Sequence, residues 1–269
     1  MPACVKKEDI GKAFAELGVR EGDIVLVHSS LKSLGFLENG PDTVIRGIES
    51  LIGKEGTLVM PTLCSVDFMN SYKTWYMDKP SDVGYLTEYF RKLPYVYRSN
   101  HATHSVAARG KKAYELTYEH GARGPHLCPF GEYAFADSSP WNKLYQADAH
   151  IVFLGVDLMY NTMKHMIEAS FTEWLLEKVK DEEKVTYLKS KLRKFETFDD
   201  GGIWPFYSAP KMEEALETAG LITHTKCGQA ELKRISAKES SDFALEELKN
   251  HHENYVSQMT MDWIKECLE

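Results

Sequence analysis

The sequence predicts one α/β domain over residues 1–269, with parallel strands and an antiparallel addition near the C-terminus. Through the first two thirds of the chain, short apolar runs typical of buried strands alternate with segments of helical periodicity. The first strand–helix–strand unit contains a crossover, which favours parallel pairing. No linker rich in Pro, Gly or Ser and no internal repeat interrupts the chain, so the sequence gives no reason to divide it.

The elements of the first two thirds follow from apolar patterns and from helix start signals. We expect strands at 24–27, 57–60, 105–108 and 151–156. We expect helices at 7–17, 85–93, 111–120 and 162–180, a helix that starts at Pro41 and a short one that starts at Pro140. Proline is favoured in the first helical turn, which supports the last two starts. The segments 64–83 and 121–139 are expected to be long loops.

Beyond residue 180 the pattern changes. Segments 184–198 and 221–235 predict hairpin strands, and the second is expected to turn at Gly228. A short helix is expected at 210–218, and the chain is expected to be helical from Ser241 onward. We expect the apolar positions of this last region to face inward: Leu245, Leu248, Tyr255, Val256 and Met259.

Composition narrows the functional classes. The formal net charge of −8 disfavours nucleic acid as a partner and suits a cationic substrate better. No apolar run approaches the ~20 residues that cross a bilayer, and the N-terminus lacks the apolar stretch of a signal peptide. The five cysteines lie far apart, which argues against disulfides and against a cysteine-based zinc site. We therefore expect a cytoplasmic protein that is not bound to a membrane.

The segment from Asn161 to Glu168 carries the strongest chemical signal. It follows a predicted buried strand and opens a predicted helix, with Thr162 as a suitable N-cap. His165 and Glu168 are three residues apart, so they are neighbours on one face of the helix. The positive end of the helix dipole disfavours the imidazolium form of His165. A neutral imidazole oriented by a carboxylate is suited to act as a general base, although a polar pair that only stabilises the helix start has the same spacing.

Three other polar segments have a simple structural alternative. The loop that begins Ser29-Ser30-Leu31 follows a strand end, where open α/β sheets bind ligands, but it also fits an ordinary turn. It contains no GxGxxG and no Walker pattern. His101 and His104 have a spacing that suits a metal, with His165 or Glu168 as a third ligand, yet no HExxH or CxxC supports a metal site. We expect no metal, and we expect a tight turn at 199–202.

Five segments appear in one order over residues 11–170: VHSSLKSLG, GPDTVIRGIESLIGKEGTLVMPT, RSNHATHSVAARGKKAYEL, SSPWNKLYQADAHIVFLGV and NTMKHMIEAS. With FDDGG further on, they resemble the aminoglycoside 3-N-acetyltransferase family, antibiotic acetyltransferases distinct from the GNAT superfamily. The resemblance implies a three-layer α/β/α fold with a mixed sheet. It also implies acetyl transfer from acetyl-coenzyme A to the 3-amino group of a 2-deoxystreptamine aminoglycoside, which confers antibiotic resistance.

The resemblance also implies roles for individual residues. His165 and Glu168 match the histidine–glutamate pair of the family, and Asp200 or Asp199 falls near the position of a third catalytic group. We take Asp200 for that role and Asp199 as an acceptor contact. The residues expected along the coenzyme are Ser29, Ser30, Leu31, Ser105 and Thr162.

The expected mechanism is direct transfer without a covalent enzyme intermediate. His165 takes a proton from the acceptor amine, and Glu168 orients the ring and stabilises the imidazolium. We expect Asp67, Asp199 and Glu168 to receive the cationic acceptor. The alternatives are an acyltransferase of the same fold that acts on another amine, a metal-dependent hydrolase, and a coenzyme-binding relative without catalysis. An oligomer is compatible with all of them.

Overall fold

The computed structural model describes residues 4–66, 68–131, 133–195 and 201–269. In this part of the chain, seven strands form one mixed sheet in the order β3-β4-β2-β1-β5-β7-β6. The strands are β1 (Ile24–Ser29), β2 (Thr57–Pro61), β3 (Tyr97–Arg98), β4 (Val106–Gly110), β5 (His150–Leu154), β6 (Thr223–Cys227) and β7 (Ala230–Ser236). The helices are α1 (Lys7–Glu16), α2 (Pro41–Ile52), α3 (Phe68–Lys73), α4 (Tyr85–Phe90), α5 (Ala113–Thr117), α6 (Pro140–Gln146), α7 (Lys164–Glu177), α8 (Glu182–Ser190), α9 (Ala209–Thr218), α10 (Ala237–His251) and α11 (Gln258–Leu268).

The centre of the sheet is parallel and its flanks are antiparallel. β1 pairs in parallel with β2 on one side and with β5 on the other. β4 pairs with β2, and β7 with β5, in the antiparallel sense. The central strands are apolar along nearly their whole length because both faces of the sheet are covered, whereas the edge strand β6 alternates exposed and half-buried residues.

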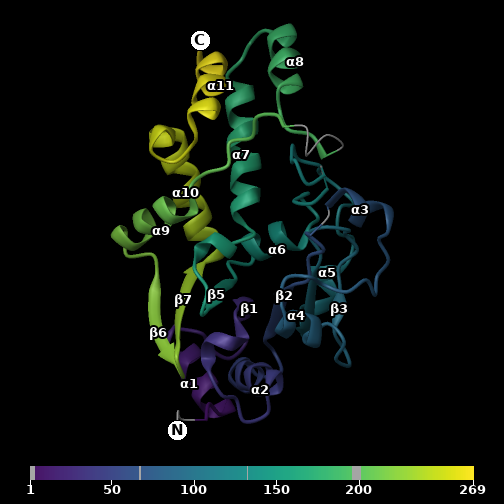
Figure 1. Ribbon diagram of the computed structural model, residues 1–269, viewed down its shortest axis with the longest axis vertical. Coiled ribbons are helices and arrows are strands. Elements are labelled where there is room, and N and C mark those ends of the chain that lie inside the picture. Colours follow the sequence, from purple (N-terminus) through teal and green to yellow (C-terminus); the bar gives the residue numbers. More distant parts are fainter. Residues whose placement is uncertain (1–3, 67, 132, 196–200) are drawn as a thin grey trace.

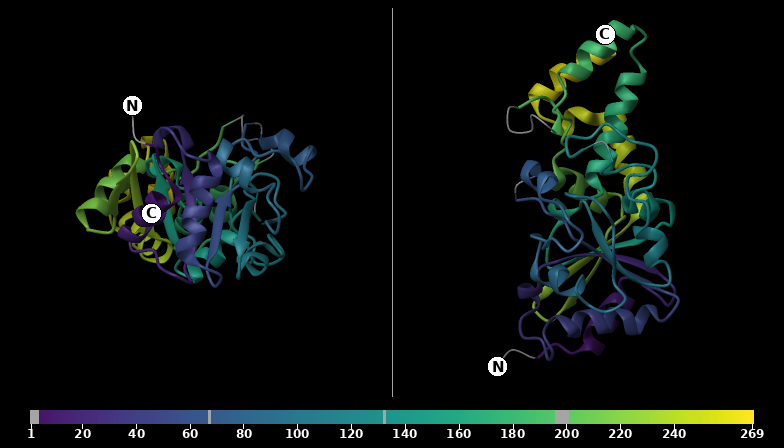
Figure 2. Two further views of the ribbon diagram at one scale, coloured as in Figure 1. Left: turned by 90° about the horizontal axis from the view of Figure 1, so that it is seen from below. Right: turned by 90° about the vertical axis from the view of Figure 1, so that its right-hand side faces the viewer.

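Helices cover the two faces in separate layers, as the three-layer prediction requires. Residues of α1, α2 and α4 pack with one set of strand side chains, which includes Val25 and Leu58. Residues of α5, α6, α7 and α10 pack with the opposite set, which includes Leu26 and Val59. α1 and α2 lie at one end of the longest axis, and α8 and α11 lie at the other (Figures 1 and 2).

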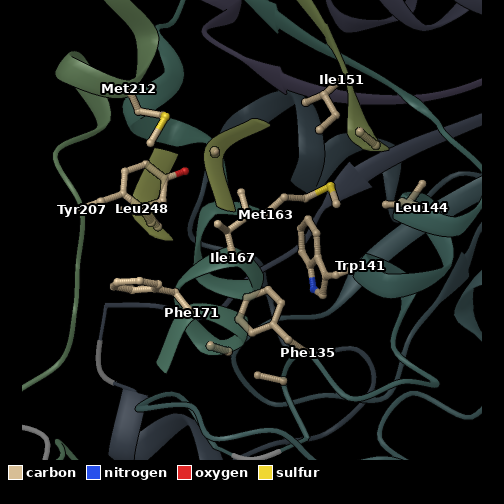
Figure 3. Packing of buried hydrophobic residues seen from close by; sticks show 14 of the residues in the cluster. Phe135, Trp141, Leu144, Ile151, Met163, Ile167, Phe171, Tyr207, Met212 and Leu248 are labelled. Carbon is tan, nitrogen blue, oxygen red and sulfur yellow. The ribbon is translucent and has the colours of Figure 1, made fainter. Parts of the chain in front are cut away.

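The start of α7 is embedded in the larger of these two cores. Met163 and Ile167 pack among the rings of Phe135 and Trp141, as Figure 3 shows. Met163 and Trp141 are 0% exposed, and complete burial of such a side chain contributes about 1.5–3 kcal/mol to stability. Burial of this kind fixes the first turn of α7, which carries His165.

Most of the elements predicted from the sequence are confirmed. The four strands predicted in the first two thirds of the chain, the helix starts at Pro41 and Pro140, and the C-terminal hairpin with its turn near Gly228 are all present. The segment 111–120 forms a shorter helix than expected, and the 64–83 segment contains α3. Within the described residues, no helix combines the length and apolarity that a membrane span needs.

Two predictions for the last third of the chain are wrong. Of the predicted strand segment 184–198, residues 184–190 lie in helix α8, and residues 196–198 lie outside the described part of the chain. Asp181 caps this helix by accepting hydrogen bonds from the backbone N–H groups of Glu183 and Lys184. The β-branched residues Val185 and Thr186, which favour strands, made this helix start hard to identify from the sequence. Met259 was expected to face inward, but it is 57% exposed.

Candidate active site

The site lies where the carboxyl ends of β1 and β5 meet. These strands are parallel neighbours, and the helices that follow them, α2 and α7, pack on opposite faces of the sheet. In open α/β sheets, the crevice at such a reversal is where ligands bind. The chain after β1 supplies the loop that begins at Ser29, and the chain after β5 supplies His165.

His165 lies in the first turn of α7, as expected, but the helix is not capped by Thr162. The flanking residue is Met163, which has helical backbone angles and makes no side-chain capping bond. The Thr162 carbonyl accepts a hydrogen bond from the His165 backbone N–H at 3.2 Å. Thr162 is 8% exposed, and its predicted place along the coenzyme stays a prediction.

His165 and Glu168 form a direct pair. The Nδ1 atom of His165 lies 2.7 Å from Oε2 of Glu168, while Oε1 accepts a hydrogen bond from the backbone N–H of Tyr207 at 3.2 Å. Glu168 is 0% exposed and the His165 side chain is 19% exposed. Because the carboxylate accepts at Nδ1, that nitrogen carries the proton and Nε2 is left as the basic atom. Nε2 has no hydrogen-bond partner within the described part of the chain.

Aromatic rings surround the imidazole of His165. The ring centroid of Phe130 is 4.6 Å away, that of Phe206 is 5.9 Å away, and that of Phe135 is 6.2 Å away. The ring of His104 meets it edge-on at 6.1 Å. Apolar walls exclude water and strengthen every electrostatic interaction inside them, including the one between His165 and Glu168.

The neighbouring histidines are neutral. Burial holds the pKa values of His101 and His104 well below the ordinary value, and proximity to His165 lowers that of His104 further. His101 Nδ1 accepts the backbone N–H of His104 at 3.0 Å, so its proton is on Nε2, which lies 3.1 Å from the Tyr72 hydroxyl. That hydroxyl donates to the Phe130 carbonyl at 3.0 Å. The described residues contain no group of three or more His, Cys, Asp or Glu side chains placed to hold a metal ion.

A cavity of about 980 Å³ lies beside this cluster. His101 lines it, and so do Leu127, Cys128 and Gly131 of the segment 127–131, which we call the strap. Phe130 belongs to the same strap, but its ring packs on His165. The strap therefore lines the cavity and also contacts the imidazole, and its backbone is held by the Tyr72 hydroxyl. Burial raises the pKa of the Cys128 thiol, so Cys128 is not a nucleophile.

The serine loop (Ser29–Leu31) is packed tightly against the exit of β5. The backbone N–H of Ser30 donates to the carbonyl of Leu154 at 2.9 Å. The Ser33 hydroxyl donates to the carbonyl of Ser30 at 2.6 Å. A Cβ atom at Gly155, whose φ is +65°, would overlap that hydroxyl oxygen. Ser29, Ser30 and Leu31 are each half-buried, which leaves part of the loop open at the carboxyl end of the sheet.

The remaining predicted site residues have different outcomes. Ser105 is 0% exposed, and its hydroxyl donates to the Thr62 carbonyl at 2.8 Å and accepts from Arg98 Nε at 3.1 Å, so its contact with a coenzyme stays a prediction. Asp67, Asp199 and Asp200 lie outside the described residues.

Glu168 was also expected to contact the acceptor. In this structure its carboxylate is fully buried and binds His165 and the backbone of Tyr207 instead, so we retain only its predicted action on His165.

Helix α7 also supplies the carboxylate of a second histidine–glutamate pair, which sequence analysis missed. His126 Nδ1 lies 2.9 Å from Glu173 Oε2, and His126 Nε2 lies 3.0 Å from Asp137 Oδ1. Glu173 also accepts the backbone N–H of Leu127 at 2.9 Å, which ties the strap to α7. The hydrogen bond to Glu173, helped by Asp137, raises the pKa of His126 to about 9. These partners are distant in the sequence, so no local pattern indicates the pair.

Comparison with known proteins agrees with the predicted family and fold. A family model described as aminoglycoside 3-N-acetyltransferase matches residues 26–249. The SPbeta prophage-derived aminoglycoside N(3′)-acetyltransferase-like protein YokD of Bacillus subtilis is 30% identical over 184 residues, which cover 60% of this chain and 64% of YokD. Aminoglycoside N(3)-acetyltransferase III of Pseudomonas aeruginosa is 26% identical, with 88% of this chain and 91% of that protein covered. The crystal structure of AAC(3)-IVa superposes with a TM-score of 0.71 at 21% identity and covers 99% of each chain.

The fold and site thus define an α/β protein with a histidine–glutamate pair at the carboxyl end of its sheet. The family match spans more than half of the sequence, and the chain belongs to the aminoglycoside 3-N-acetyltransferase family. The alignment with YokD spans just under two thirds of that relative.

Proposed function

We propose that this protein transfers the acetyl group of acetyl-coenzyme A to the 3-amino group of a 2-deoxystreptamine aminoglycoside. The observation that carries the proposal is the His165–Glu168 pair, with Nδ1 held by a buried carboxylate and Nε2 without a partner in the described chain. Family membership supports the reaction class. Solved structures of similar fold include AAC-IIIb with CoASH and AAC(3)-IVa with apramycin, which support the two proposed reactants.

The proposed chemistry needs a base more than it needs a nucleophile. An aminoglycoside amine arrives largely as ammonium and attacks a carbonyl only after losing a proton. Nε2 of His165 accepts that proton, and Glu168 stabilises the imidazolium through Nδ1–H. The aromatic rings around His165 keep water from competing for the proton.

Acetyl-coenzyme A would supply the thioester, and the serine loop fits a role in holding it. Ser29–Leu31 is partly open at the crevice between β1 and β5, and its backbone is fixed to the end of β5. Backbone N–H groups of this loop or near Thr162 are the candidates for stabilising the oxyanion that forms on the thioester carbonyl. Asp200 remains our candidate for a third group near His165.

The proposal is tested by measuring thiol release from acetyl-coenzyme A with a panel of aminoglycosides as acceptors. We expect turnover that depends on the acceptor, with mass spectrometry placing one acetyl group on the 3-amino nitrogen. Thiol release at the same rate without any acceptor contradicts amine transfer. Turnover that a chelator abolishes supports the metal-dependent alternative instead.

The role of the serine loop is tested with a pair of glycine variants. Gly155→Ala adds a methyl group against Ser33, whereas Gly220→Ala adds one at a similar positive φ of +72° with no atom within 4 Å. Both changes strain the backbone by about 1 kcal/mol, but only the first should displace the loop. We expect Gly155→Ala alone to raise the KM for acetyl-coenzyme A. Equal KM values for acetyl-coenzyme A in the two variants would show that the loop does not contribute to coenzyme binding.

A further inference from the structure

The charged residues that line the large cavity in the described structure are basic, whereas the whole protein carries a net negative charge. The chain carries a formal net charge of −8, which favours a cationic ligand. The wall formed by α8 and the residues after it nevertheless contributes Lys189, Arg193 and Lys194 to the cavity. Among the described lining residues there is no Asp or Glu. Within the described lining, the charges closest to a bound ligand are therefore positive and favour an anion.

The two lysines of this wall are available to a ligand. Lys189 and Lys194 are exposed, and neither forms an ion pair within the described residues. Many other lysines of the chain lie beside a carboxylate, such as Lys191 beside Glu266 at 2.6 Å. The Arg193 guanidinium lies over the ring of Phe206, 5.9 Å from its centroid, and Phe206 in turn contacts His165. The basic wall thus adjoins the aromatic shell of the proposed base.

Aromatic side chains also line the cavity. They include Tyr72, Trp75 and Phe195, and the rings of Tyr72 and Phe195 are 4.2 Å apart. Trp204, also in the lining, is 4% exposed, and its indole Nε1–H is buried without an acceptor among the described residues. A ring binds well against aromatic faces, and an oxygen acceptor satisfies an unpaired N–H.

We propose that this cavity binds an anionic group of phosphate or carboxylate type, carried on a molecule with a ring, through Lys189, Arg193 and Lys194. The cavity volume of about 980 Å³ lies in the range of pockets that bind small molecules and cofactors. Two reactants can supply the anion: the coenzyme with its phosphates, or an acceptor amine that itself bears an acidic group. In the second case the acceptor is not an unmodified polycation. The inference rests on the proposed function only in naming these two sources.

Binding is tested by titrating the protein with pyrophosphate in a calorimeter at fixed ionic strength. The variant Lys189→Gln/Lys194→Gln removes two cavity charges. The matched control Lys54→Gln/Lys265→Gln removes two charges that are also exposed, at positions outside the cavity. We expect the cavity variant to weaken binding by about tenfold or more, because charge-assisted hydrogen bonds to phosphate are lost, and the control to change it little. Equal binding in all three proteins, or none in any, overturns the proposal.

The source of the anion is distinguished by steady-state kinetics on the same three proteins. If the coenzyme supplies it, the cavity variant raises the KM for acetyl-coenzyme A and leaves the KM for acetyl-pantetheine unchanged. If the acceptor supplies it, the variant raises the KM for amines that carry a phosphate or carboxylate. The inference is contradicted if the cavity variant binds polycationic aminoglycosides as the wild type does and keeps the wild-type KM values for both acetyl-coenzyme A and the acidic amines.

Failure of the proposed function gives a different result. An absence of acetyl transfer to every amine refutes the proposed reaction, while pyrophosphate binding through Lys189 and Lys194 still supports the anion site. The opposite result is turnover with aminoglycosides, while pyrophosphate binding is unchanged by loss of the two lysines. That result supports the reaction and refutes the anion site.

Discussion

Two histidine–glutamate pairs share helix α7, and they differ in what the second ring nitrogen meets. His126 has Glu173 on Nδ1 and Asp137 on Nε2, and its side chain is 32% exposed. His165 has Glu168 on Nδ1, while aromatic rings surround the imidazole and Nε2 has no partner in the described chain. An imidazole held by two carboxylates is a stabilised cation that ties the strap to α7. An imidazole held by one carboxylate keeps a basic nitrogen free for a substrate proton.

The comparison teaches that the pairing itself does not identify a base. The distances from Nδ1 to the carboxylate are similar, 2.9 Å for His126 and 2.7 Å for His165. Burial of the carboxylate differs more, since Glu173 is 29% exposed and Glu168 is 0% exposed. A fully buried carboxylate with both oxygens bonded has little freedom to move, so it fixes the orientation of the His165 ring.

The largest expected effect separates the two histidines by turnover. His165→Ala should lower kcat by about 10² to 10⁴-fold, the usual contribution of a general base. His126→Ala should lower kcat by less than about threefold, because it removes a contact outside the reacting groups. Steady-state kinetics and acetyl-coenzyme A binding of both variants check this. A similar loss in the two would place His165 in a structural role like that of His126.

A smaller effect is expected from the glutamates. Glu168→Gln keeps the volume but removes the charge that stabilises the imidazolium, so it should cost about 1.5–3 kcal/mol of barrier, or about 10- to 150-fold in kcat. Glu173→Gln should leave kcat within about threefold, since its amide oxygen still accepts the Leu127 N–H. Comparing kcat at saturating substrate isolates the transition-state contribution. A Glu168→Gln enzyme with wild-type kcat would remove Glu168 from the proposed mechanism.

The smallest expected effect is on stability against pH. The pKa of His126 is raised to about 9 in the folded protein, mainly by its hydrogen bond to Glu173, from an ordinary value of 6.5. Its stabilisation is therefore complete below pH 6.5 and is lost as the pH rises through about 9. Solvent screens this partly exposed site, so we expect the ion pair to add about 1 kcal/mol to the free energy of unfolding, or about 2–4 °C to Tm.

Calorimetry of the wild type and His126→Gln between about pH 6 and 10 tests this assignment. The difference in Tm should be largest at the acid end and should close toward the alkaline end. A difference that does not change with pH would contradict the ion pair.

The sequence was informative where the signal was local, and it failed where partners are distant in the chain. His165 and Glu168 lie in one helical turn, so their spacing predicted their contact. The buried central strands were evident from their apolar runs. Neither the His126–Glu173 pair nor the packing of Phe130 on His165 has a local pattern, because both depend on how the strap lies on α7. The buried state of Ser105 likewise depends on Arg98, which reaches it from β3.

The sequence also did not predict the basic side of the cavity, because this feature too depends on how distant segments pack. Net charge is a property of the whole chain, and it suggested a site for cations. The position of α8 decides which charges face the cavity, and the sequence pattern had assigned that segment to a strand.

The central claim, that Nε2 of His165 accepts the proton of the acceptor amine, is tested most directly by chemical rescue. Turnover of the His165→Ala enzyme is measured at saturating acetyl-coenzyme A and acceptor while free imidazole is added. We expect imidazole to restore activity in proportion to the concentration of its neutral form, while the His126→Ala enzyme does not respond. A His165→Ala enzyme that binds acetyl-coenzyme A normally but gains no turnover from imidazole at any concentration would contradict the account.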